Sequence, residues 1–373
     1  MILTPPVAQS LTIHSDSADV SLDATGRWKT FRSDKGVFRN TLTGKVVYSA
    51  LNHVEIISER QKELLKKDLL RELNKLIHLA ENGKITEEES SLKSSEARVS
   101  ALKNGLNWIT LHESNSAERF KSVYPEKITM LPPDRYKDIV ILPATGCPHS
   151  ECTFCSLYDD VGFKPLSNIE FENHLKGVKN LFGDALEERT GIFLGSASAL
   201  SLGQRKMTGV IEKLMEEFGF LKRGVATFFD PYHAPRRNSA DFKVLKDLGL
   251  RQVTIGLESG LPELRGLWGK SPQLNSFSEA VRQLKKAGIQ VAITILTGFD
   301  AGAFHQKHVE ATSEIVRSLP LEKSDIIYLS PYFPARLTER ESTIQLQSFK
   351  KVLKNESNAK VVSYHVDRFH YFV

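Results

Sequence analysis

Short apolar runs and longer helical patterns alternate through the second half of the chain. The runs are β-branched and apolar at nearly every position, which is typical of parallel strands buried on both faces. They are Ile139–Leu142, Gly191–Leu194, Val225–Phe229, Gln252–Gly256, Val291–Leu296 and Asp325–Leu329. Capping boxes and glycines between them are expected helix starts and ends, namely Ser167–Glu170, Ser276–Glu279, Gly249 and Gly288. Six such strands with five intervening helices predict an α/β fold, a β/α array closed or partly closed into a barrel.

The first 136 residues follow a different pattern, with little helical periodicity before about residue 55. Trp28–Phe31 and Phe38–Val47 have the composition of short strands around glycine turns. We therefore divide the chain into an N-terminal α+β region (1–136), a β/α core (137–335) and a C-terminal extension (336–373).

Two helices are expected within the N-terminal region. The first begins at Ser58, which forms a capping box with Gln61, and it stops at Gly83. Its apolar stripe consists of Leu65, Leu69, Leu73, Leu76 and Ile77. Thr86 with Glu89 is expected to start the second helix, which ends by Gly105, so that the two helices form a hairpin.

Composition indicates an ordinary soluble protein. Hydrophobic residues make up 40% and charged residues 25% of the chain, and a net charge of +5 does not by itself imply nucleic acid. The chain has no apolar run of membrane-spanning length, and its first residues lack the features of a signal peptide. We expect a cytoplasmic protein with no membrane partner.

All 3 cysteines lie close together, at Cys147, Cys152 and Cys155. Three thiols always leave one over after disulfide pairing, and clustered thiolates favour a soft metal or an iron–sulfur cluster. Closed zinc sites use four ligands. The set therefore either borrows a ligand, for which His149 is the nearest candidate, or leaves a metal position open for catalysis. Structural zinc or incidental cysteines remain the alternative.

The segment Gly-Cys-Pro-His-Ser-Glu-Cys-Thr-Phe-Cys, residues 146–155, resembles the cluster loop of radical S-adenosylmethionine (radical SAM) enzymes. The spacing is C-x4-C-x2-C, where the commonest family spacing is C-x3-C-x2-C. The resemblance implies that Cys147, Cys152 and Cys155 hold three irons of a 4Fe–4S cluster and that SAM binds the fourth. It also implies a partial (β/α)6 TIM-like barrel and places Phe154 beside the adenine of SAM.

The resemblance further assigns SAM contacts to the ends of later strands. Gly195, Ser196 and Ser198 correspond to the family's contacts with the SAM amino group, where relatives often carry acids. A Gly-x-Glu-Ser-Gly sequence closely matches the family's strand-four motif. Glu258 is therefore expected near the ribose hydroxyls, and Ser259 near the methionine carboxylate.

Two later loops complete the expected cofactor site. Gly298 is expected beside the adenine, and Tyr332 is expected to stack on it or to face substrate, although a buried aromatic at a strand end is often simply core. Lys270 resembles, with altered order, a lysine-glycine element that follows the strand-four motif in relatives.

Asp230, Tyr232 and His233 follow the third strand and are the best candidates for substrate-side chemistry. We take Asp230 and Tyr232 as the catalytic candidates, with a turn or helix-capping acid as the alternative. His365 and His370 indicate no more than a strand.

The sequence thus predicts a radical SAM enzyme, an oxidoreductase or lyase. Reductive cleavage of SAM would give a 5′-deoxyadenosyl radical that takes hydrogen from a small-molecule substrate. Its expected partners are that substrate and an electron donor such as flavodoxin or ferredoxin. Residues 1–136 would shape or cover the substrate opening.

Counting the cysteines narrows the reactions that we expect. With all 3 in the loop, neither a cysteine-ligated auxiliary cluster nor a methyl-cysteine route is expected, and residues 1–136 contain no recognisable cobalamin-binding domain. Two alternatives stay open. One is an RNA-modifying radical SAM enzyme, against which the modest charge argues; the other is a non-catalytic iron–sulfur or zinc-binding protein.

Overall fold

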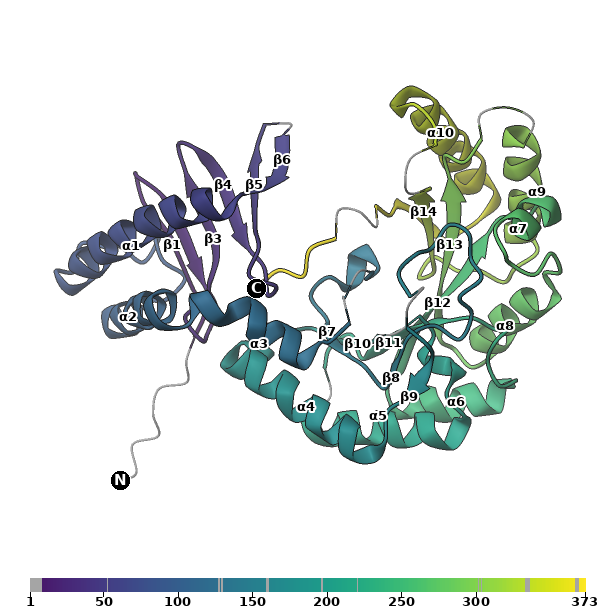
Figure 1. Ribbon diagram of the computed structural model, residues 1–373, viewed down its shortest axis with the longest axis horizontal. Coiled ribbons are helices and arrows are strands. Elements are labelled where there is room, and N and C mark those ends of the chain that lie inside the picture. Colours follow the sequence, from purple (N-terminus) through teal and green to yellow (C-terminus); the bar gives the residue numbers. More distant parts are fainter. Residues whose placement is uncertain are drawn as a thin grey trace. The chain divides into compact units, whose positions relative to one another are not determined.

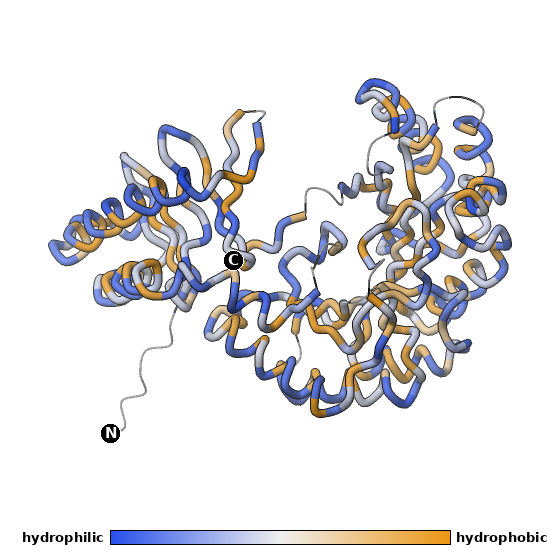
Figure 2. Tube along the Cα trace, viewed as in Figure 1, coloured by the Kyte–Doolittle hydropathy of each residue, from blue (hydrophilic) through white to orange (hydrophobic). Residues whose placement is uncertain are grey.

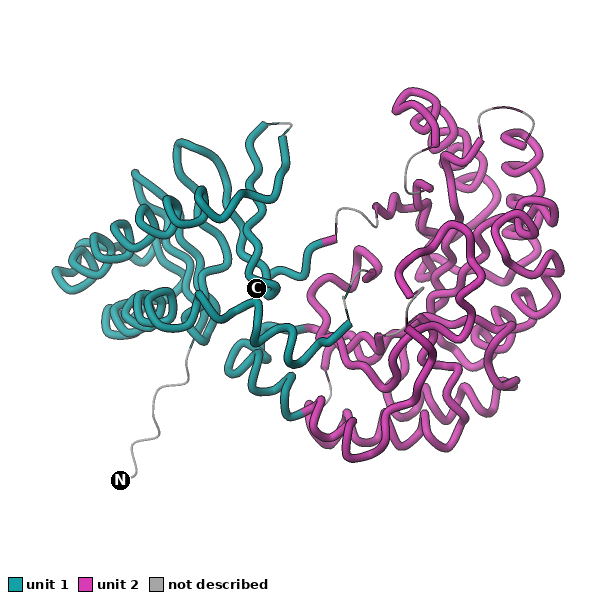
Figure 3. The backbone as a smooth tube through the Cα atoms, in the orientation of Figure 1, with its two compact units in different colours: residues 1–128, 176–189, 370–373 teal, residues 129–175, 190–369 magenta. Residues whose placement is uncertain are grey.

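The chain divides into two compact units, coloured separately in Figure 3. Unit 1 consists of residues 1–128, 176–189 and 370–373, and unit 2 of residues 129–175 and 190–369. The computed structural model describes residues 9–51, 53–126, 128, 130–158, 161–195, 197–219, 221–300, 302, 304–332, 336–365 and 369–373.

Unit 1 is built on a 6-stranded antiparallel sheet in which each strand pairs with its neighbour in sequence. Its strands are β1 (Leu11–His14), β2 (Asp19–Leu22), β3 (Trp28–Ser33), β4 (Gly36–Asn40), β5 (Val46–Ala50) and β6 (His53–Ile56). Three helices follow, α1 (Glu59–Glu81), α2 (Ser95–Leu111) and α3 (Ser116–Val123). Figure 1 shows α1 and α2 lying together beside this sheet.

The first predicted helix is confirmed, and the second starts later than predicted. Ser58 and Gln61 form the expected capping box of α1, and its leucine stripe is buried. Thr86 and Glu89 exchange capping hydrogen bonds, but the chain then turns, because Ser90 bridges to Ile13 of β1. The helix begins only at Ser95.

Gly105 lies inside α2, and the prediction that it ends the helix is wrong. A Cβ at this position would meet Leu22 Cδ1 at 2.6 Å. The glycine therefore serves close packing of α2 against β2.

Unit 2 contains a 7-stranded parallel sheet in the order β15-β14-β13-β12-β11-β10-β7. Its strands are β7 (Ile139–Ile141), β10 (Ile192–Leu194), β11 (Val225–Phe229), β12 (Leu250–Glu258), β13 (Gln290–Thr297), β14 (Ile326–Pro331) and β15 (Lys360–Ser363). All six predicted strands are present. Within the described residues β7 and β15 do not pair with each other, so the array is a partial barrel.

The helices of unit 2 follow the strands in alternation. They are α4 (Asn168–Phe182), whose second half is counted with unit 1, α5 (Gln204–Phe218), α6 (Ser239–Leu248), α7 (Pro262–Leu267), α8 (Asn275–Lys286), α9 (His305–Arg317) and α10 (Glu339–Glu356). Hydrophobic positions concentrate along the strands in Figure 2. Among the residues with described structure, no helix is long and apolar enough to cross a membrane.

Two expectations for unit 2 need correction. Residues 336–373 do not form a separate extension, because α10 leads into β15 and β15 pairs with β14. The helix that Ser276 was expected to cap already begins at Asn275, so Ser276 lies in its first turn. The caps formed by Ser167 and Gly249 are as predicted.

Candidate functional site

The three cysteines lie on a loop that leaves the sheet after β7. A short antiparallel pair, β8 (Ala144–Thr145) and β9 (Lys164–Pro165), joins the two ends of this loop, and Cys147 bridges to Gly162 just inside it. Cys147, Cys152 and Cys155 form no disulfide, and all three are partly buried. Because the carboxyl ends of parallel strands share one edge of a sheet, the loop sits where α/β folds bind ligands.

Hydrogen bonds fasten the cysteine loop to the segment after α7. The Thr153 backbone N–H donates to the Trp268 carbonyl (3.2 Å), and its hydroxyl donates to the Leu267 carbonyl (3.0 Å). The His149 ring donates from Nε2 to the Gly269 carbonyl (2.8 Å). We call these three bonds the loop clamp. They fix the cysteines relative to the end of α7.

Two glycines allow the backbones to approach closely enough for this arrangement. A Cβ at Gly269 would lie 2.1 Å from the Glu151 carbonyl oxygen, and a Cβ at Gly146 would lie 2.4 Å from that of Gly162. Both glycines have positive φ, of +70° and +69°. No other residue fits either position without moving the loop.

The thiols of Cys147 and Cys152 favour the protonated form unless a metal binds them. Burial raises the pKa of Cys152 to about 12, although the Lys270 ammonium opposes this shift. Burial likewise raises the pKa of Cys147, whose sulfur also lies 2.9 Å from the His149 carbonyl. Since thiolates are the ligand form, metal binding must displace these protons.

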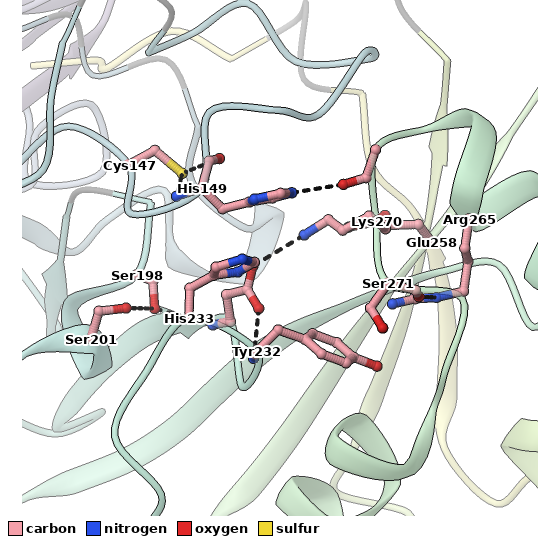
Figure 4. Close-up of polar contacts among 12 residues, drawn as sticks. Cys147, His149, Ser198, Ser201, Tyr232, His233, Glu258, Arg265, Lys270 and Ser271 are labelled. Carbon is pink, nitrogen blue, oxygen red and sulfur yellow. Dashed lines mark hydrogen bonds and ion pairs between the residues drawn. The ribbon is translucent and has the colours of Figure 1, made fainter.

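A closed circuit of side chains lies beside the loop (Figure 4). Lys270 pairs with Asp230 (3.4 Å), and Asp230 pairs with His233 (3.2 Å). The His233 ring stacks on the His149 ring, with centroids 4.1 Å apart. The His149 ring donates a hydrogen bond to the backbone carbonyl of Gly269, the residue before Lys270. The circuit joins the loops that follow β7, β11 and β12.

Asp230 and Lys270 each stabilise the charged form of the other. Burial would raise the pKa of Asp230, but Lys270, the Tyr232 amide and His233 hold it below its usual range. Burial would lower the pKa of Lys270, but Asp230, Cys152 and Glu258 raise it. Lys270 therefore stays charged at the centre of the site.

Tyr232, predicted as a catalytic residue, is engaged elsewhere. Its hydroxyl donates to the Gln273 carbonyl (2.6 Å), and the Arg265 guanidinium lies 5.5 Å from the centre of its ring. His233, the third candidate after β11, has a side chain that is 37% exposed.

Glu258 has a strained backbone and a carboxylate with weak partners. Its φ is +61°, and the pairing of β12 with β13 shifts register between Gly256 and Glu258. The carboxylate lies over Gly256, where a Cβ would be 2.1 Å from Oε1, and its contacts with the Thr294 hydroxyl are 3.4 Å long. Burial raises its pKa. Strain and poor hydrogen bonding in one buried carboxylate are typical of a ligand site.

Ser259 is hydrogen-bonded within the protein in this structure, and its contact with the methionine carboxylate stays a prediction. The side chain is fully buried, its Oγ lies 2.8 Å from His308 Nδ1, and the Leu261 N–H donates to the same oxygen. His308 Nε2 faces the Leu296 carbonyl (2.9 Å), so Nε2 carries the proton and the Ser259 hydroxyl donates to Nδ1. Ser259 thus links the end of β12 to α9.

The residues predicted for the SAM amino group have structural roles too. Ser198 is buried and accepts from the Asp230 N–H (3.1 Å) and from the Ser201 hydroxyl (3.0 Å), so it orients the end of β11. At Gly195 a Cβ would meet Leu142 Cδ2 at 2.5 Å, so this glycine serves packing between strands. Ser196 lies outside the described residues.

Aromatic side chains gather next to the cysteine loop. Phe154 meets Trp268 edge to face (6.2 Å), and Tyr332 is 95% buried against Trp268 and Phe299. Gly298, with φ +77°, donates its N–H to the Gln345 side chain on α10. An apolar wall beside the cluster loop suits a flat adenine, and the predicted contacts of Phe154, Gly298 and Tyr332 stay predictions.

The donor set fits an iron–sulfur cluster better than a borrowed histidine ligand. The His149 ring donates from Nε2 to the Gly269 carbonyl and stacks on His233, so Nε2 is not available as a metal ligand. Within the described part of the chain, no three His, Cys, Asp or Glu side chains converge on one metal ion. Thiolates that each bind a different iron of a cluster need not converge on one point.

A family model matches the central part of the chain. Residues 141–301 match the family model of the radical SAM superfamily. These residues form a radical SAM domain. The match confirms the predicted family and enzyme class and supports the predicted cofactors, a 4Fe–4S cluster and SAM.

Relatives of the radical SAM domain are distant. An uncharacterized methyltransferase, PH0819 of Pyrococcus horikoshii, is 23% identical over 223 residues, which are 56% of this chain and 44% of that protein. The chain thus spans less than half the length of this curated relative.

The similarity to solved structures is weak. Methylornithine synthase (PylB) has a TM-score of 0.42 at 15% identity, over 80% of this chain and 85% of that chain. The methyltransferase TsrM of Kitasatospora setae, solved with cobalamin and a 4Fe–4S cluster, has a TM-score of 0.41 at 16% identity, over 52% of this chain and 37% of that one.

Sequence reasoning missed Thr153 and Arg265 and gave Lys270 and His233 only secondary roles. Thr153 stands between two cysteines, a position that could have drawn notice. Arg265 is fully buried and donates to the carbonyls of Leu257 and Ser271. No local sequence pattern predicts these hydrogen bonds.

The loop clamp predicts a difference between two substitutions of Thr153. Thr153→Val removes the hydroxyl that donates to Leu267, whereas Thr153→Ser keeps it. Losing one such bond costs about 1 kcal/mol, so we expect the valine variant to hold several-fold less iron per chain after reconstitution at limiting iron. Iron analysis and the electron paramagnetic resonance spectrum of the reduced protein measure this. Equal loading of the valine and serine variants would contradict the clamp.

His308 predicts a dependence of stability on pH. Burial lowers its pKa from 6.5 to about 4, so the folded chain binds this proton less readily than the unfolded chain. The stabilisation is therefore complete above pH 6.5 and is lost as the pH falls toward 4. We expect the free energy of unfolding to fall by roughly 2 kcal/mol more in the parent than in His308→Gln between about pH 7 and about pH 5.

Urea unfolding of the apo protein at the two pH values measures the His308 effect. Exposed His78 on α1 provides the matched control, since His78→Gln should keep the parent's pH dependence. If His78→Gln flattened the profile as much as His308→Gln, the assignment to the buried ring would fail.

Proposed function

We propose that this chain is a radical SAM enzyme whose Cys147, Cys152 and Cys155 hold a 4Fe–4S cluster and that it acts on a small-molecule substrate. The observation that carries the proposal is the set of three thiols on one clamped loop, none of them in a disulfide, next to a histidine that is already bonded to Gly269. Such a set leaves one metal position for a ligand other than protein. The loop also stands at the edge of the sheet where α/β enzymes bind their substrates.

When bound, the cluster would supply the electron that cleaves SAM into methionine and a 5′-deoxyadenosyl radical, which takes hydrogen from substrate. Lys270 favours the thiolate form of Cys152 and balances the negative charge of the site. Glu258 offers a buried carboxylate to the ribose hydroxyls. Phe154 and Tyr332 provide the apolar wall that keeps water away from the adenine.

On the substrate side, the structure favours His233 over the earlier candidates. Asp230 is 14% exposed and occupied by two ion pairs, so it orients His233 through Nδ1 rather than meeting substrate itself. The other ring nitrogen of His233 is then available to donate to or accept from a substrate. A histidine held by a carboxylate in this way is suited to proton transfer.

Partners and reaction class complete the proposal. We infer a cytoplasmic oxidoreductase or lyase that receives electrons from a carrier such as flavodoxin or ferredoxin. Methyl transfer is the second candidate reaction, because the curated relative carries that name. The two reactions differ in their SAM-derived products, which are 5′-deoxyadenosine for hydrogen abstraction and S-adenosylhomocysteine for a simple methyl transfer.

The test is a product assay under anaerobic conditions. The protein is reconstituted with iron and sulfide, reduced with dithionite and given SAM, and its products are separated by chromatography. We expect 5′-deoxyadenosine from the parent and from Ser156→Ala, an exposed neighbour in the loop, and none above background from Cys152→Ala. Stoichiometric zinc without a cluster, or S-adenosylhomocysteine as the only product, would contradict the proposal.

A further inference from the structure

Unit 1 contains a cavity that the radical SAM reaction leaves unexplained. Its volume is about 420 Å³, which is within the range of small-molecule sites. It is bordered by α2, by the start of α3 and by the last turn of α4. Among the residues that the structure describes, the lining includes two arginines, one histidine and three asparagines, and no aspartate or glutamate.

One face of α2 supplies much of this lining. Asn104, Asn107, Trp108 and His112 recur at helical spacing, so they share a face of the helix. Asparagine is a poor helix former, and two of them in the middle of α2 lower its intrinsic stability. Ligand recognition would account for their presence.

The polar side chains that line the cavity are exposed to solvent, namely Asn104, Asn107, His112, Arg119 and Asn180. Among the interactions of the described residues, the side chains of Asn104, Asn107, Asn180 and Arg119 make no hydrogen bond or ion pair. Each amide offers two donors and an acceptor, and the Arg119 guanidinium offers a planar fork that suits an oxyanion. A ligand with both an anionic group and hydrogen-bonding groups would satisfy them together.

The floor of the cavity is rigid. Arg27 is buried, pairs with Asp23 (2.7 Å) and donates to the carbonyls of Leu181 (2.8 Å) and Phe182 (3.1 Å) at the end of α4. Trp108 beside it is 93% buried. Arg27 and Trp108 therefore form a fixed floor beneath the exposed side chains.

We propose that this cavity, which we call the amide pocket, binds a small oxyanion-bearing molecule. Arg119 and His112 bind the phosphate or carboxylate, and the three asparagine amides bind the remaining polar groups above Trp108. The pocket lies wholly within unit 1, so its test needs neither cluster nor SAM and is independent of the proposed function.

The experiment titrates the full chain with four probes and follows binding by calorimetry and by tryptophan fluorescence. Inorganic phosphate and malonate separate phosphate from carboxylate recognition, and adenosine 5′-monophosphate is compared with uncharged adenosine. We expect at least one anionic probe to bind with a dissociation constant of about 1 mM or lower, and adenosine to bind at least about tenfold more weakly than its monophosphate if the monophosphate is the probe that binds.

Two variants and a matched control locate the binding. Arg119→Gln removes the cation and Asn107→Asp adds an opposing charge, so each should weaken anion binding by about tenfold or more. Lys103→Gln removes the same charge from α2 at a side chain that pairs with Glu81, outside the pocket, and should leave binding unchanged. Circular dichroism checks that each variant is folded.

Two outcomes would overturn the proposal. One is that no anionic probe binds the parent chain at millimolar concentration. The other is that Lys103→Gln weakens binding as much as Arg119→Gln does, which would mean a general effect of net charge.

Discussion

The loop clamp is the contact on which the rest of the site depends. Three hydrogen bonds from His149 and Thr153 to the carbonyls of residues 267–269 hold the cysteine loop, and the missing Cβ of Gly269 lets the two backbones touch. Residues 267–269 lie between Glu258, at the end of β12, and Lys270. The contact of the cysteine loop with this segment therefore brings the thiols close to the Lys270 ammonium and to the Glu258 carboxylate, which is expected to contact SAM. These groups are thereby held in one site at the edge of the parallel sheet where α/β folds bind ligands.

Charge balance explains why so many ionisable groups can be buried here. Asp230, Glu258 and the thiol of Cys152 all act on the ammonium of Lys270, and each would be costly to ionise without it. Burial still raises the pKa of Glu258 and of Cys152, which favours their neutral forms while no cofactor is bound. Iron would bind Cys152 as the thiolate, so cluster binding would displace the proton that burial retains.

The elements could be predicted from the sequence because their signals are local, whereas the site geometry depends on distant contacts. Buried parallel strands appear as apolar runs, and all six predicted ones are present. By contrast, His149 meets a carbonyl 120 residues away, and Ser259 is taken by His308, 49 residues away on α9. The late start of α2 has the same cause, because Ser90 is drawn to β1. Motif spacing located the thiols, but it could not show which polar side chains the fold would occupy.

Mössbauer spectroscopy of the anaerobically reconstituted full chain, with and without SAM, tests the central claim most directly. Three protein ligands on a clamped loop should give a 4Fe–4S cluster in which one iron differs from the other three, and SAM should alter the signal of that iron alone. A cluster whose irons ignore SAM, or a protein that takes up zinc in place of iron, would contradict the account.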